Sequence, residues 1–242
     1  MEITYIGHSG FLLEWETCYW LFDYYKGDIP ELNTGKKLIV FASHKHADHF
    51  NPEVLKLQEQ YYDILYVLSS DIKHKSDSST GTGMATDKLI SVKPNQEYNL
   101  YVSSNDKIIL KTLKSTDSGV AFLLTYLGKT IYHAGDLNLW LWKEETKQYN
   151  NNMKAMFEKQ MESLKDLSID IAFAPLDPRQ EEWSYMGLEY LFSTAKVRYA
   201  FPMHFWDQPE IIQHFKRDRS SIITSVNVMD ISREGQSFTL DI

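Results

Sequence analysis

Cysteine is almost absent from this sequence, and long apolar runs are absent altogether. The single cysteine among the 242 residues, Cys18, has no second cysteine with which to form an intramolecular disulfide. Apolar residues nowhere continue for the roughly 18 positions that a membrane-spanning helix needs. The first residues also lack the basic and apolar segments of a signal peptide. We therefore expect a cytoplasmic protein with no membrane contact.

Basic residues are scarce relative to acidic ones. The chain has 33 acidic and 25 basic residues, and its formal net charge is -8. Proteins that bind nucleic acid gain much of their affinity from basic residues that displace counterions from phosphates, so this balance disfavours such a partner. A small molecule is the expected partner.

The chain has no stretch of glycine, serine or proline long enough to act as a linker. Its two most polar stretches, residues 73–86 and 143–154, are expected to be surface excursions. A chain of this length with 43% hydrophobic residues can bury one sizeable core. We predict a single domain, residues 1–242, and leave open whether it forms a homo-oligomer.

Short apolar runs bounded by turn residues predict β-structure in both halves of the chain. A hairpin that closes on Asp23 is matched by a second hairpin that closes on Asp136, which indicates an internal repeat. The continuous apolar run at residues 38–42 is typical of a strand buried on both faces. The other expected elements are strands at 3–6, 11–15, 19–22, 62–68, 169–175 and 197–203, helices from 51, at 144–167 and at 187–196, and a strand-rich finish at 221–242.

Four residues of metal-binding type follow the apolar strand directly. His44, His46, Asp48 and His49 lie within six consecutive positions. Imidazole and carboxylate bind zinc and its neighbours among the transition metals, and two histidines two positions apart on an extended loop can reach one ion. Hydrogen bonding on a polar loop is the alternative. The spacing favours a metal centre at the carboxyl end of the strand.

Residues 44–49 resemble the His-x-His-x-Asp-His signature of the metallo-β-lactamase superfamily. The resemblance extends along the chain, because Asp23, Asp136 and His204 stand where that family has its other acidic and histidine positions. The chain is most similar to the branch of compact hydrolases that includes the ascorbate-phosphate lactonases. The resemblance implies an α/β fold, a four-layer αββα sandwich of two mixed sheets with outer helices.

The resemblance also implies a function and a set of ligands. One or two divalent transition-metal ions are expected, zinc first, with manganese and iron as alternatives. A pair of ions can hold and deprotonate one water and stabilise charge on the attacked group. We therefore expect a metal-dependent hydrolase that uses a metal-bound hydroxide on a small-molecule ester, lactone or phosphodiester, with Asp48 also catalytic. The implied ligands are His44 and His46 for the first ion, Asp48, His49 and His204 for the second, and Asp136 for both.

The sequence departs from the family pattern at one ligand. The first ion of the family normally has a third histidine before the second hairpin, but residues 113–119 of this chain contain none. Asp117 or His8 could replace it, and we favour Asp117 slightly. The chain would otherwise hold one ion, or lose its first ion easily. Asp23 is expected to orient a ligand, with a satisfied aspartate at a strand end as the alternative.

Aromatic residues follow several ligand positions, as Trp140 follows Asp136. Because loops beyond strand ends build the sites of such folds, we predict a partly apolar pocket with Trp140, Lys45 and Arg179 as substrate contacts. His133 is predicted to be structural. Two other functions stay open: a nuclease or phosphodiesterase acting on nucleic acid, and a non-catalytic metal-binding protein that retains the fold.

Overall fold

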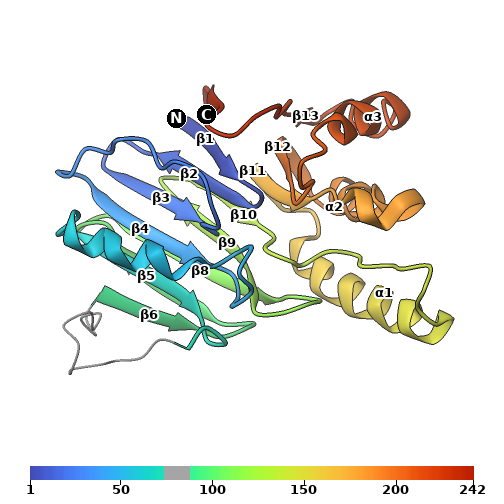
Figure 1. Ribbon diagram of the computed structural model, residues 1–242, viewed down its shortest axis with the longest axis horizontal. Helices are drawn as coiled ribbons and strands as arrows, with labels where there is room; N and C mark the ends of the chain where they lie inside the picture. The colour runs from blue at the N-terminus through green and yellow to red at the C-terminus, as the bar shows by residue number, and fades with distance from the viewer. Residues whose placement is uncertain (74–87) are drawn as a thin grey trace.

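The computed structural model describes residues 1–73 and 88–242 of the chain. The polar stretch predicted at 73–86 therefore lies almost entirely outside the described residues. Two seven-stranded sheets form the centre of the structure (Figure 1). The first sheet has the order β14-β1-β2-β3-β4-β5-β6, built from β1 (Glu2–Gly7), β2 (Gly10–Glu14), β3 (Cys18–Phe22), β4 (Lys37–Ala42), β5 (Ile64–Ser69), β6 (Leu89–Val92) and β14 (Ser237–Thr239).

The second sheet has the order β13-β12-β11-β10-β9-β8-β7. In both sheets, antiparallel strands are followed by parallel ones: β3 pairs parallel with β4, and β10 pairs parallel with β11. This shared pattern agrees with the internal repeat predicted from the sequence. The strands of the second sheet are β7 (Glu97–Tyr101), β8 (Lys107–Lys114), β9 (Val120–Tyr126), β10 (Lys129–His133), β11 (Ser168–Pro175), β12 (Lys196–Met203) and β13 (Asn227–Val228).

The main core lies between the two sheets, because alternate strand residues point to opposite faces. Phe11 of β2 packs on Phe173 of β11, with ring centroids 4.5 Å apart. Leu21, which alternates with the inward-facing Trp20, belongs to a separate cluster on the outer face of the first sheet. Burial on both faces explains the continuous apolar runs of these strands.

Helical segments cover the outer faces and complete the four layers. Val54 of the 3₁₀ helix η1 (Pro52–Glu59) packs on the outer cluster of the first sheet. Three helices lie together on one side of the sheets, namely α1 (Lys147–Met161), α2 (Met186–Thr194) and α3 (Glu210–Asp218), with the short η3 (Glu162–Leu164) and η4 (Pro178–Trp183) between them (Figure 1). Among the described residues, no helix is both long and apolar enough to cross a membrane.

Several predicted elements differ from the observed ones. The helix expected from residue 51 is a 3₁₀ helix, capped by the Asn51 side chain and started by Pro52. The helix expected at 144–167 begins only after Thr146, whose side chain accepts a hydrogen bond from the Tyr149 amide. The finish at 221–242 contains only the short strands β13 and β14, so the strand-rich prediction was wrong there. Helix α3 and strands β6 to β8 were not predicted.

Candidate metal centre

The candidate site lies where parallel strands of both sheets end. Asp23 follows β3, His44 follows β4, Asp136 follows β10 and His204 follows β12. Their side chains meet at one edge because parallel strands bring their carboxyl ends together, the usual position of sites in α/β folds.

The first ligand group consists of His44, His46, Asp117 and Asp136. One potential ligand atom from each of these residues lies within 4.8 Å of all the others. His46 Nδ1 is 3.3 Å from Asp117 Oδ2, and His44 Nε2 is 3.4 Å from Asp136 Oδ2. Asp117 thus stands where the missing third histidine was expected, beside the two histidines of the first ion.

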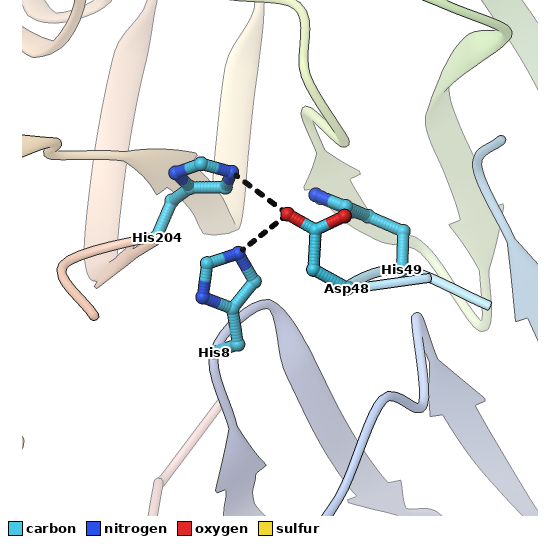
Figure 2. Close-up of side chains that lie close together, drawn as sticks. All are labelled: His8, Asp48, His49 and His204. Atoms are coloured by element: carbon cyan, nitrogen blue, oxygen red, sulfur yellow. Dashed lines mark ion pairs between the residues drawn. The ribbon is translucent and has the colours of Figure 1, made fainter. Parts of the chain in front are cut away.

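The second ligand group consists of His8, Asp48, His49 and His204 (Figure 2). Asp48 Oδ2 lies 3.4 Å from His8 Nε2 and 3.8 Å from His204 Nε2. The sequence offered His8 as a replacement ligand for the first ion. The structure instead places it with the second group, because the tip of the β1–β2 hairpin approaches the loop after β12.

Asp136 faces both groups. Its Oδ2 atom is directed to His44, while its Oδ1 atom lies 3.1 Å from His49 Nε2 and 3.5 Å from His204 Nε2. A carboxylate with one oxygen toward each of two histidine clusters has the placement of a bridging ligand.

The donor atoms fit metal ions because they are buried and unsatisfied. Within residues 1–73 and 88–242, no hydrogen-bond partner reaches His8 Nε2 or His44 Nε2, and the 3.1 Å contact of His49 Nε2 with Asp136 Oδ1 lacks hydrogen-bond geometry. A buried polar atom without a partner is costly, so several of them converging on one place point to a ligand between them. Burial and the neighbouring Asp136 carboxylate raise the pKa of Asp117, and a bound cation would relieve this repulsion.

The protonation state of His44 also suits metal binding. Burial, together with the nearby His49, lowers the pKa of His44 to about 4, so its imidazole is neutral at pH 7. Only a neutral imidazole has a lone pair to give to a metal ion. His44 is therefore ready to bind without first losing a proton.

Two buried aspartates orient the histidines of the second group. His49 Nδ1 donates to Asp23 at 2.8 Å, and His204 Nδ1 donates to Asp177 at 2.9 Å, which leaves both Nε2 atoms facing the site. Burial alone would raise the pKa of Asp177, but hydrogen bonds from His204 and Arg179 lower it to about 2. Sequence reasoning anticipated Asp23 and missed Asp177, although Asp177 also follows the end of a buried strand.

Backbone strain is concentrated at this site. His8, Asp23 and His204 have φ values of 55°, 40° and 63°, in the left-handed region that side chains with a Cβ rarely adopt. Strained backbone persists only where the surrounding structure holds it, and it is frequent at functional sites. The local conformations are thus set by the geometry of the site.

A cavity of about 280 Å³ adjoins the two groups. Five of its lining residues are candidate metal ligands, namely His46, Asp48, Asp117, Asp136 and His204, and the others include Trp140, Trp142, Tyr149, Met153 and Arg179. Helix α1 supplies Tyr149 and Met153, so the polar stretch at 143–154 borders the cavity.

The three predicted substrate contacts occupy different positions. Arg179 and Trp140 line the cavity, and the Trp140 Nε1 atom also donates to the Asp136 carbonyl oxygen at 2.9 Å. Lys45 is exposed and does not line the cavity, and its amide donates to Asp71. His133 belongs to neither ligand group: its Nε2 donates to the Ser9 carbonyl oxygen at 3.0 Å, in agreement with its predicted structural role.

Comparison with known proteins identifies the family and the fold. Residues 2–152 match the family model described as the beta-lactamase superfamily domain. The chain is 26% identical over 223 residues to a UPF0173 metal-dependent hydrolase of Opitutus terrae, with 87% of each chain covered. Igni18, a metallo hydrolase of Ignicoccus hospitalis, has a TM-score of 0.65 at 20% identity, with 100% of this chain and 98% of that chain covered. The diiron β-hydroxylase CmlA of Streptomyces venezuelae has a TM-score of 0.57 at 10% identity, with 100% of this chain and 54% of that chain covered.

The fold and the family match define a protein of the metallo-β-lactamase superfamily, and the chain belongs to it. Within that superfamily it is a metal-dependent hydrolase. The sequence predictions of family, fold and enzyme class are confirmed.

Proposed function

We propose that the chain binds two divalent transition-metal ions, one in each ligand group, and hydrolyses a small-molecule ester, lactone or phosphodiester in the adjoining cavity. The observation that carries the proposal is the position of Asp136, with one carboxylate oxygen toward each group of histidines. When bound, such ions activate water at neutral pH and stabilise negative charge on the group that is attacked.

The protein's own residues would hold and orient the reactants. Asp48 both belongs to the second ligand group and lines the cavity, so we assign proton transfer with the attacking water to this carboxylate. Asp23 and Asp177 fix the rings of His49 and His204, which keeps the metal ligands in place during the reaction.

The positions of Arg179 and two tryptophans indicate a substrate that has both a negative charge and an apolar part. The guanidinium of Arg179 lies 4.6 Å from the ring centroid of Trp206, and the Arg179 side chain remains about half exposed at the cavity. Trp140 and Trp142 present parallel rings, 6.0 Å apart, on the same cavity wall. A guanidinium binds carboxylate and phosphate well, while the indole rings suit an apolar group.

The ligand types bear on which metals bind. The imidazoles of His49 and His204 and the carboxylate of Asp48 in the second group suit zinc. The first group has two imidazoles and two carboxylates, and this larger share of oxygen ligands also suits manganese or iron. We propose zinc in the second site, and zinc, manganese or iron in the first.

The test is elemental mass spectrometry of protein purified without chelator or nickel, together with a hydrolysis screen. The screen pairs anionic with neutral versions of the same esters, lactones and phosphodiesters. We expect close to two ions per chain and a higher kcat/KM for the anionic members. Retained metal with no turnover of any substrate would indicate a binding protein, and a preference for neutral substrates would remove Arg179 from the substrate site.

Replacing Asp117 by alanine is expected to lower the metal content from two ions to one. The variant removes a carboxylate from the first group and leaves all four residues of the second group unchanged. Elemental analysis gives the count, and the exposed Asp28, changed to alanine, serves as the control. A count that stays at two in the Asp117→Ala variant would assign Asp117 a structural role.

A further inference from the structure

His8 is held at the tip of the β1–β2 hairpin against the loop that carries His204. Its carbonyl oxygen accepts a hydrogen bond from the His204 amide at 3.2 Å. The His8 ring packs at 4.2 Å from the His204 ring and at 4.6 Å from the Trp206 ring, measured between centroids. The direction of the His8 ring is therefore fixed by contacts with a segment almost 200 residues away in the sequence.

The imidazole of His8 points into the second ligand group (Figure 2). Its Nε2 atom is 3.4 Å from Asp48 Oδ2, and this buried nitrogen has no hydrogen-bond partner in the part of the chain that the structure describes. Neighbouring ligands about 2.1 Å from one five-coordinate zinc ion lie roughly 3.0–3.6 Å apart. The spacing of His8 and Asp48 is thus the spacing of two ligands that share an ion.

The position of His8 excludes a direct role toward substrate. Asp48 and His204 line the cavity, whereas His8 does not and is only 4% exposed. Its nitrogen approaches the second group from the protein side. This nitrogen is buried and has no hydrogen-bond partner among the described residues, and both facts support a role in metal binding.

We propose that His8 is a metal ligand that gives the second site four protein ligands besides Asp136, for a divalent ion such as zinc. The first site has three such ligands, two of which, His46 and Asp117, are exposed at the cavity. The second ion is therefore bound more tightly, and the first exchanges more readily. This inference rests on the proposed two-metal function.

The variant His8→Asn tests the proposal. Asparagine tolerates the positive φ of this position better than most residues but has no imidazole nitrogen. The measurements are zinc affinity by competition with a chromophoric chelator, and the visible absorption of the protein loaded with Co²⁺, which responds to the number and type of ligands. Loss of a residue that only supports a metal ligand lowers metal affinity by roughly 10–100-fold. We expect the zinc affinity of the second site to fall by at least this much, because His8→Asn removes a ligand itself. The Co²⁺ spectrum is expected to change as well.

His214→Asn is the matched control, because His214 is exposed on α3 and belongs to neither ligand group. Its affinity and spectrum are expected to equal those of the unchanged protein. Unchanged zinc affinity and an unchanged Co²⁺ spectrum in His8→Asn would overturn the proposal.

Thermal unfolding of the metal-free proteins separates a ligand from a structural residue. For a ligand, the metal-free His8→Asn variant unfolds at about the same temperature as the unchanged protein, and only metal binding weakens. A lower unfolding temperature with unchanged zinc affinity would overturn the proposal. His8→Gly, which relieves the positive φ, replaces the asparagine variant if that variant does not fold.

The same titration keeps the two proposals apart. If the unchanged protein binds a single ion and His8→Asn weakens it, His8 is a ligand and the two-metal function is wrong. If the unchanged protein binds two ions and His8→Asn alters neither, the two-metal function stands and His8 is not a ligand.

Discussion

Replacing His46 and His49 together by alanine is expected to remove bound metal and hydrolysis. His46 belongs to the first ligand group and His49 to the second, so the double variant takes a nitrogen from each site. We expect metal content near zero and a loss of kcat/KM on the order of 10³-fold or more, since the ions supply most of the catalysis. Elemental analysis and the best substrate of the screen provide the two measurements.

The double variant needs a control for folding. Asp23 is completely buried, and without His49 it loses a hydrogen bond to its ionised carboxylate. Circular dichroism of the metal-free proteins shows whether the variant still folds. The control variant His214→Ala removes a histidine from a surface away from the site. A folded double variant with undiminished metal content would contradict both ligand groups.

The sequence predicted that the candidate ligands close together in the chain would meet at one site. His44, His46, Asp48 and His49 follow a strand whose apolar run marks it as buried, so their meeting at one strand end could be predicted from spacing and periodicity. Asp117 could be named because the family resemblance places a ligand just before the second hairpin. Apolar runs predicted the central strands in the same way, whereas the four-layer fold was implied by the resemblance of residues 44–49 to the family signature.

The sequence could not predict contacts between distant elements. Whether His8 reaches the first or the second group depends on how the β1–β2 tip packs against the loop after β12, and periodicity does not report that packing. The pairing of Asp177 with His204 has the same origin, because the two residues follow neighbouring parallel strands of the second sheet. Helix α3 and strands β6 to β8 were missed because they are short or carry exposed polar residues.

In each half of the chain, a buried aspartate orients a histidine that we propose as a metal ligand. In the first half, Asp23 after β3 receives a hydrogen bond from His49, and in the second half Asp177 after β11 receives one from His204. Asp136, between the two pairs, is the residue on which both halves converge. The two aspartates are not counterparts in the internal repeat, which matches Asp23 with Asp136, so the same orienting contact occurs at different strand ends in the two halves.

Gly119 lies where the two halves of the chain meet, in contact with Ser43 and next to His44 of the first ligand group. It adopts a φ of 66°, and a Cβ at this position would lie 2.0 Å from the Ser43 carbonyl oxygen and 2.6 Å from His44 Cβ. The next residue, Val120, donates its amide to that same carbonyl at 2.9 Å, which ties β9 to the end of β4. There is no space for a methyl group unless the backbone of Ser43 and His44 moves.

Gly119→Ala is therefore expected to destabilise the metal-free protein by about 3 kcal/mol or more, because the strain of a positive φ adds to a clash with backbone. Displacement of His44 should also weaken binding of the first ion. Denaturant unfolding and metal titration measure the two effects. Gly128→Ala is the matched control: its φ is 74°, but a Cβ there meets no atom within 4 Å, so it pays only the conformational cost of about 1 kcal/mol. Equal effects of the two substitutions on stability and metal binding would show that Gly119 does not set the position of His44.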